Sequence, residues 1–208
     1  MSTLLGIISD VHADTSALEE ALRAMKRLRV DRVVCAGDIV DYGRDPEGTI
    51  RLLRESGVVC IRGNHDSWAL KGIGDHAKRL SPGALAFLRT LPKRCDIVVE
   101  GLRIAIRHAR PPEDDMLGID PDVEQPEDLA AMLFEADRAD VLIVGHTHRS
   151  FRLEAKGGGI VVNPGALLRD PERGVHVPTP GTFATLELPG CHFTVRYAFD
   201  GAPVGEHT

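Results

Sequence analysis

Six short segments of the chain place an oxygen or imidazole donor beside a glycine or at the end of an apolar run. They are Asp10-Val11-His12, Gly37-Asp38-Ile39-Val40-Asp41, Gly63-Asn64-His65-Asp66, His108, Gly145-His146-Thr147-His148 and Asn163-Pro164-Gly165. Carboxylate, imidazole and amide side chains together are a ligand set for hard-to-borderline divalent metals. The types and order of these donors therefore predict a site for two divalent metal ions.

Short apolar strands explain how donors so far apart in the sequence can meet. Five runs rich in Val and Ile have the periodicity of strands, at residues 4–9, 32–36, 58–61, 104–107 and 141–144. In an open α/β sheet, ligands bind outside the carboxyl ends of the strands, and the first five donor segments each follow one of these runs. The sheet is therefore expected to gather the donors.

Spacing within two of the segments supports this expectation. Residues two apart at the end of a strand point to the same side, so Asp10 with His12, and His146 with His148, can each present two donors to one cavity. Either pair taken alone is more typical of a surface turn. The prediction rests on five such segments at five strand ends.

The order and residue types of these segments resemble the motifs of the calcineurin-like metallophosphoesterase superfamily. That pattern runs Asp-x-His, Gly-Asp-x-x-Asp, Gly-Asn-His-Asp or -Glu, a lone His and Gly-His-x-His, and it is matched from Ser9 to about Gly165. The resemblance implies one metal held by Asp10, His12, Asp38 and His148, and another held by Asp38, Asn64, His108 and His146, with Asp38 as the bridge. One departure is that Ala109, where many members have Gly, follows His108.

The chemistry implied is hydrolysis of a phosphate ester. Two metal ions about 3.5–4 Å apart polarise the phosphoryl oxygen and supply a metal-bound hydroxide as nucleophile. His65 is predicted to be the general acid, and Asp66 resembles the family's acidic partner of that His or caps a helix starting near Ser67. Asp41 is predicted to orient a ligating His or to fix its loop. Arg62 is predicted to bind phosphate bidentately, the alternative being an arginine in solvent.

Strand, helix and strand alternate up to Ile61, and hairpins follow. The three predicted hairpins pair residues 97–99 with 103–107, 151–155 with 160–162, and 182–188 with 192–198. Helices are predicted from a capping box of Ser16 and Glu19, from Ser81-Pro82, and around Leu129 to Leu133. The predicted fold is an α/β two-sheet mixed β-sandwich flanked by α-helices, with one domain over residues 1–200 and a frayed tail over 201–208.

Composition limits the partners. The 208 residues carry 31 acidic and 25 basic side chains, a formal net charge of -6, which argues against tight binding to long nucleic acid. The four cysteines have no metal or redox spacing, as expected for a thiol-reduced cytoplasmic protein. No apolar run approaches the roughly 20 residues that cross a membrane, and no signal peptide precedes Leu4. We expect a small phosphorylated substrate and no membrane partner.

Three function classes remain open on the sequence. The favoured one is hydrolysis of phosphodiesters in small molecules, since the chain has no added recognition domain. The second is a phosphomonoesterase or protein phosphatase using the same site, and the third is a non-catalytic scaffold like the phosphoesterase-like subunit of the retromer coat. Mn is the metal favoured by the resemblance, while Fe, Zn, Co and Ni suit the same donors. The sequence leaves open the natural substrate, assembly into a homo-oligomer, and the role of the acidic, Pro-rich loop 110–128, as lid or solvated connector.

Overall fold

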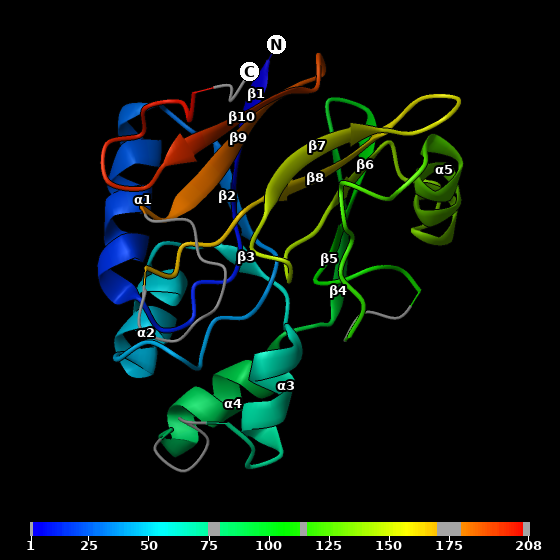
Figure 1. Cartoon of the computed structure of the whole chain (residues 1–208). Helices are drawn as coiled ribbons and strands as arrows, with labels where there is room; N and C mark the ends of the chain where they lie inside the picture. The colour runs from blue at the N-terminus through cyan, green and yellow to red at the C-terminus, as the bar shows by residue number, and fades with distance from the viewer. Residues whose placement is uncertain (1, 75–79, 113–115, 170–179, 206–208) are drawn as a thin grey trace.

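The computed structural model describes residues 2–74, 80–112, 116–169 and 180–205, and within them two five-stranded sheets face each other (Figure 1). The first sheet has the order β10 (His192–Tyr197), β9 (Thr182–Leu188), β1 (Thr3–Ile8), β2 (Arg32–Cys35) and β3 (Val59–Cys60). The second has the order β4 (Arg94–Val99), β5 (Leu102–Arg107), β6 (Val141–Ile143), β8 (Ile160–Pro164) and β7 (Ser150–Glu154). The predicted two-sheet mixed sandwich is confirmed.

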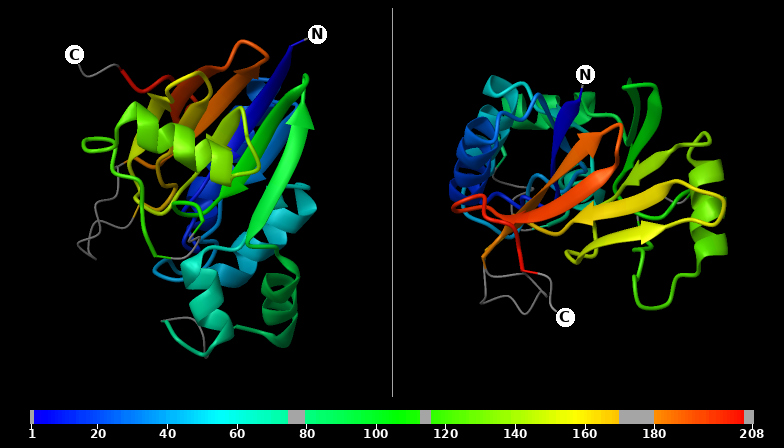
Figure 2. Two further views of the ribbon diagram at one scale, coloured as in Figure 1. Left: turned by 90° about the vertical axis from the view of Figure 1, so that its right-hand side faces the viewer. Right: turned by 90° about the horizontal axis from the view of Figure 1, so that it is seen from above.

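Helices cover the outer faces of both sheets (Figures 1 and 2). α1 (Thr15–Arg27) and α2 (Pro46–Glu55) pack on the first sheet, and α5 (Pro126–Glu135) packs on the second. α3 (Asn64–Leu70) and α4 (Pro82–Thr90) lie together at one end of the molecule. Among the described residues, no helix combines the length and apolar character needed to span a bilayer.

The parallel strands position the donor segments. β1, β2 and β3 are parallel in the first sheet, and β5, β6 and β8 are parallel in the second. The remaining strands of each sheet pair antiparallel with their neighbours, in the three predicted hairpins. Because the carboxyl ends of parallel strands share an edge, the loops after β1, β2, β3, β5 and β6 meet there.

Apolar side chains between the sheets hold the sandwich together. Leu5 and Ile7 of β1 pack against Ile106 and Ile143 from the second sheet, and all four are fully buried. Burying each such side chain stabilises the fold by about 1.5–3 kcal/mol. On the other face of β1, a Cβ on Gly6 would lie 2.9 Å from the sulfur of Met25 in α1, so glycine allows the helix to approach closely.

Two local predictions are confirmed and one is wrong. Ser81 caps α4, accepting a hydrogen bond from the Ala84 N–H at 3.1 Å, and Leu129 lies in α5 as expected. The predicted capping box of Ser16 and Glu19 is wrong, because the N-cap is Asp14, two residues earlier, whose side chain accepts from the Ala17 N–H at 2.9 Å.

The first part of the predicted tail has backbone partners. Pro203 forms a β-bridge with Arg196, and the Val204 N–H donates to the carbonyl of Val195 at 2.9 Å. Residues 201–204 are therefore hydrogen-bonded to β10. Residues 206–208 of the predicted tail lie outside the described part of the chain.

Candidate metal centre

Asp10, His12 and His148 form the first cluster of donors. His12 and His148 bring their Nε2 atoms to 3.2 Å of each other, and Asp10 Oδ1 lies 3.3 Å from His148 Nε2 and 3.9 Å from His12 Nε2. All three side chains are buried. The first follows β1 and the last follows β6, so this cluster joins loops from both sheets.

Asp38, Asn64, His108 and His146 form the second cluster. Asn64 Oδ1 lies 2.9 Å from His108 Nε2 and 3.0 Å from His146 Nδ1, and Asp38 Oδ2 lies 3.2 Å from His108 Nε2. Asp38 follows β2, His108 follows β5, and Asn64 opens α3. The donor atoms of Asp38, His108 and His146 are mutually close enough to hold one ion.

Asp38 connects the two clusters. Its Oδ2 atom lies 3.8 Å from His12 Nε2 in the first cluster as well as 3.2 Å from His108 Nε2 in the second. Its Oδ1 atom accepts a hydrogen bond from the His65 N–H at 2.9 Å, which fixes the carboxylate plane. The structure thus brings together all seven side chains that the sequence predicts as ligands.

Backbone carbonyls orient two of the imidazoles. His12 Nδ1 lies 3.2 Å from the carbonyl of Val40, and His108 Nδ1 lies 2.7 Å from that of Ala36. A carbonyl only accepts, so Nδ1 carries the hydrogen, and Nε2 faces the cluster, where it would give its lone pair to a metal ion. The nitrogen and oxygen atoms that converge here are donors of the types that divalent metal ions bind. The residues present therefore fit two metal ions.

The loops that carry the donors have an uncommon backbone. Five of the seven predicted ligands have left-handed φ angles, namely Asp10 at 51°, His12 at 46°, Asp38 at 53°, His146 at 70° and His148 at 59°. Such angles cost residues with a Cβ about 1–3 kcal/mol each and persist only where the surroundings hold them. This strain is concentrated at the donor edge of the sheets.

Two glycines let the donor loops approach each other. Gly37 has a φ of +101°, and a Cβ there would lie 2.9 Å from His108 Nδ1. A Cβ on Gly63 would lie 2.1 Å from Asp38 Oδ1. Any larger residue at either position would push the second cluster apart.

Burial and neighbouring charges set the protonation of the donors. Burial raises the pKa of Asp38, but the charge and hydrogen bond of His108 outweigh it and hold the pKa below its usual value. Burial lowers the pKa of His12 to about 4, against the attraction of Asp38. An ionised bridging carboxylate and a neutral imidazole are the forms that bind metal.

Asp41, Tyr42 and His65 form a hydrogen-bonded group beside the clusters. His65 Nδ1 lies 2.9 Å from Asp41 Oδ2, and its Nε2 lies 3.2 Å from the Tyr42 hydroxyl. The rings of His12 and Trp68 pack on His65 with centroids 4.9 Å and 4.7 Å away. Tyr42 is absent from the predicted site, and only its place after Asp41 could have drawn attention to it.

The structure corrects the role assigned to Asp66. Its carboxylate accepts hydrogen bonds from the backbone N–H groups of Ile39, Val40 and Gly63, at 2.9, 3.1 and 3.0 Å. The contact with His65 predicted for Asp66 is made by Asp41 instead. Asp66 is also not an N-cap, because α3 begins at Asn64 after its N-cap Gly63. Asp66 therefore ties the loop after β2 to the turn before α3.

Arg62 and Asn163 flank the donors. The Arg62 N–H donates to the carbonyl of Pro92 at 2.8 Å, and its buried Nε atom has no hydrogen-bond partner among the described residues. Asn163 donates to the carbonyl of Gly145 at 2.8 Å and accepts from the Gly165 N–H at 2.9 Å. Asn163 thus supports the loop that carries His146 and His148.

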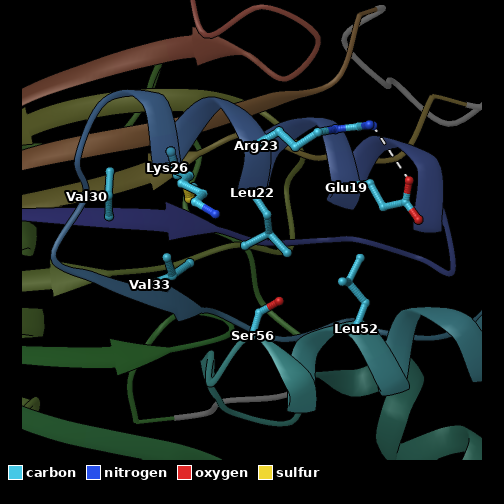
Figure 3. A pocket seen from close by; sticks show the side chains of 9 residues that line it. Glu19, Leu22, Arg23, Lys26, Val30, Val33, Leu52 and Ser56 are labelled. Carbon is cyan, nitrogen blue, oxygen red and sulfur yellow. Dashed lines mark ion pairs between the residues drawn. The ribbon is translucent and has the colours of Figure 1, made fainter.

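A separate cavity of about 550 Å³ lies away from the donors, between α1 and α2 (Figure 3). Leu22 of α1 and Leu52 of α2 line it over Val33 of β2, and the ion pair of Glu19 with Arg23, at 3.6 Å, lies on its rim. None of the metal donors lines this cavity. The candidate functional residues therefore lie at the donor edge of the sheets and not in this cavity.

Two donor clusters at the carboxyl edge of a two-sheet α/β sandwich define a dinuclear metallohydrolase. The family model of the calcineurin-like phosphoesterase superfamily domain matches residues 3–189, so the chain belongs to this superfamily of metal-dependent phosphoesterases.

The chain is also similar to individual relatives and solved structures. Uncharacterized protein MJ0912 of Methanocaldococcus jannaschii is 25% identical over 187 residues, which cover 83% of this chain and 73% of the relative. The crystal structure of a metallophosphoesterase from Sphaerobacter thermophilus is similar at 25% identity with a TM-score of 0.68, over 93% of this chain and 86% of that one. Hypothetical protein PH1004 from Pyrococcus horikoshii has the same fold, with a TM-score of 0.80 at 18% identity over 94% and 87% of the two chains.

A shorter match is to serine/threonine-protein phosphatase 1 of Salmonella typhimurium. The identity is 38% over 65 residues, which cover 31% of this chain and 30% of the phosphatase. This similarity is local, and it concerns less than a third of either protein.

Proposed function

We propose that the chain hydrolyses phosphate esters with two divalent metal ions, and that phosphodiesters of small molecules are its preferred substrates. The observation that carries the proposal is the placement of Asp38 Oδ2, at 3.2 Å from His108 Nε2 and 3.8 Å from His12 Nε2. One oxygen facing both clusters supports a pair of ions that share a carboxylate.

The remaining donors divide between the two ions. Asp10, His12 and His148 would complete one site with Asp38, and Asn64, His108 and His146 would complete the other. Once bound, two such ions polarise the phosphoryl oxygen and lower the pKa of the attacking water. We favour Mn from the family resemblance, although donors of these types also suit Fe, Zn, Co and Ni.

His65 is the proposed general acid. The Asp41 carboxylate fixes the ring through Nδ1, at 2.9 Å, and leaves Nε2 to give its proton to the leaving oxygen as the P–O bond breaks. Burial lowers the pKa of His65, but the hydrogen bond that its ring donates to Asp41 and the nearby carboxylates outweigh it and raise the pKa above its usual value. A raised pKa supplies the protonated ring that an acid needs.

The arginines near the site support a preference for diesters. Three that follow donor segments already have carboxylate partners: Arg110 with Glu124, Arg149 with Asp120 and Asp122, and Arg169 with Asp14 and Glu20. Arg62 forms no ion pair with a described residue and is the proposed phosphate ligand. A monoester carries a charge of about -2 near pH 7 and a diester only one negative charge, so a site in which several flanking arginines are already paired suits the diester.

The second candidate is a phosphatase acting on monoesters or phosphoproteins. Its support is the 38% identity with the Salmonella phosphatase over 65 residues, together with the position of Arg62 directly before Gly63. An arginine at that point can take two phosphate oxygens at once. The same metal and acid residues would serve both activities.

Hydrolysis of two nitrophenyl esters separates the candidates. Metal-stripped protein resupplied with Mn is assayed on bis-p-nitrophenyl phosphate and on p-nitrophenyl phosphate. We expect kcat/KM for the diester to be higher by about tenfold or more, since the electrostatic cost of the second charge exceeds about 1.4 kcal/mol. Monoester preference would support the phosphatase, and the absence of metal-dependent turnover on both esters would contradict the hydrolase proposal and favour a scaffold.

A matched pair of variants guards this assay against a contaminating phosphatase. Asp38→Asn should abolish turnover of both esters, because it removes the shared carboxylate. Asp128→Asn makes the same chemical change on an exposed side chain in the first turn of α5, outside the donor segments, and it should leave turnover unchanged. Equal activity in the two variants would show that the hydrolysis does not come from this site.

A further inference from the structure

Two consecutive residues contact the two nitrogens of one imidazole. Asp41 Oδ2 lies 2.9 Å from His65 Nδ1, and the Tyr42 hydroxyl lies 3.2 Å from His65 Nε2. The Asp41 contact belongs to the proposed acid, but the phenol on the opposite nitrogen has no role in the mechanism so far. Both ends of the His65 ring are engaged from a single loop.

The loop holds Tyr42 in a defined place. Asp41 and Tyr42 have φ angles of 81° and 60°, which residues with side chains adopt only when their surroundings impose them. The Gly43 N–H donates to the carbonyl of His12 at 2.8 Å, and the Tyr42 ring packs on the His12 ring with centroids 4.6 Å apart. The phenol is therefore fixed next to a predicted metal ligand.

The reaction brings the substrate to the atom that Tyr42 contacts. Under the proposed function, His65 Nε2 gives its proton to the leaving oxygen, so this oxygen has to come within hydrogen-bond distance of Nε2. The Tyr42 hydroxyl occupies that position, and a phenol both donates and accepts. The incoming oxygen takes the place of the phenol at Nε2 and then lies beside its O–H group.

We propose that the Tyr42 hydroxyl donates a second hydrogen bond to the leaving oxygen, an inference that rests on the proposed function. As the P–O bond breaks, the leaving oxygen keeps the bonding electron pair and takes the proton of His65 Nε2, while Tyr42 keeps its own proton. A fixed donor helps in proportion to the charge that develops on its acceptor. Tyr42 thereby extends the activity to esters with basic leaving groups.

Tyr42→Phe tests the inference through the leaving group. Bis-p-nitrophenyl phosphate is compared with diphenyl phosphate, or the corresponding monoesters if those are preferred, because phenolate is the more basic leaving group. Losing a hydrogen bond to a charged oxygen should reduce kcat/KM for the phenyl ester by roughly 10- to 100-fold. The nitrophenyl ester should lose about twofold or less, since nitrophenolate needs little assistance.

Tyr197→Phe is the matched control. It removes a hydroxyl from β10, where Tyr197 stacks on Phe199 with ring centroids 5.7 Å apart, and it should leave both esters unaffected. A Tyr42→Phe variant that loses the same factor on both esters, or none, would overturn the role of Tyr42 alone. A wild-type chain that hydrolyses no ester with metal would overturn the proposed function and the Tyr42 inference together.

A second readout does not depend on turnover. In the metal-free protein, the imidazole nitrogen NMR signals of His65 report the partner of Nε2, and we expect Tyr42→Phe to shift the Nε2 signal while the Nδ1 signal stays near its place. The Tyr197→Phe spectrum should match the wild type. An unchanged Nε2 signal in Tyr42→Phe would contradict the contact on which the inference depends.

Discussion

The donor clusters and the proposed acid group of Asp41, Tyr42 and His65 lie side by side but are built differently. The clusters draw their side chains from loops of both sheets, and each predicted ligand other than His146 is buried. The acid group comes from one loop and the first turn of α3, and Tyr42 is only half-buried. Changes in the clusters should therefore affect every substrate equally, whereas changes in the acid group should depend on the leaving group.

The largest effect is expected for Asp38→Asn. An amide keeps the shape of the side chain but removes the charge that faces both clusters, and the metals supply several kcal/mol of transition-state stabilisation. We predict that kcat/KM falls at least about 1000-fold on the nitrophenyl and phenyl esters alike. Retention of activity within tenfold of wild type on either ester would show that the clusters are not a shared site.

Asp41→Asn should have a smaller and more selective effect. The variant weakens the hold on His65 Nδ1, and general acid catalysis contributes about 100- to 10,000-fold to such reactions. We predict a fall of about 100-fold for the phenyl ester and under about tenfold for the nitrophenyl ester, measured as kcat/KM with saturating metal. Equal losses would assign Asp41 to the metal clusters and not to the acid.

Asp66→Asn tests the corrected role of Asp66. The backbone N–H groups now donate hydrogen bonds to the carboxylate oxygens, and the NH₂ group of Asn cannot accept them. We therefore predict a loss of about 1–3 kcal/mol in the free energy of unfolding. Asp128→Asn is the matched control, because Asp128 is also the third residue of its helix but is exposed. Urea unfolding measures the stability of both variants. An Asp66→Asn variant as stable as the control would contradict the role of Asp66 in holding the loop after β2 to the turn before α3.

Ser81→Ala should have the smallest effect. Ser81 caps α4, outside the donor segments, and loss of an N-cap costs about 1 kcal/mol of stability. We predict a lower urea midpoint with kcat/KM unchanged on both esters. A fall in activity without loss of stability would mean that α4 is coupled to the site.

The sequence predicts the convergence of the donors better than it predicts their local partners. Asp10, Asp38 and His108 each follow a strand, and they meet at one edge because the carboxyl ends of parallel strands lie on the same side of a sheet. The partner of His65 depends instead on where α3 begins. Because that helix starts at Asn64, Asp66 turns toward backbone amides, and Asp41 reaches the ring from another loop.

Tyr42 could not be found from the sequence for a related physical reason. Its contact with His65 depends on left-handed backbone at two successive residues other than glycine, which local propensity disfavours. The surrounding contacts impose this conformation, and those contacts exist only in the folded chain. The N-cap of α1 could not be found from the sequence for the same reason, because Asp14 follows Ala13, which has a left-handed φ angle of 58°.

The most direct test of the central claim is the number of metal ions bound per chain. Metal-stripped protein is equilibrated with Mn, freed of unbound metal and analysed for metal and protein content. Two clusters that share Asp38 predict two ions per wild-type chain and a lower count in Asp38→Asn. A wild-type chain that binds one ion or none, under conditions that leave it folded, would contradict the dinuclear site.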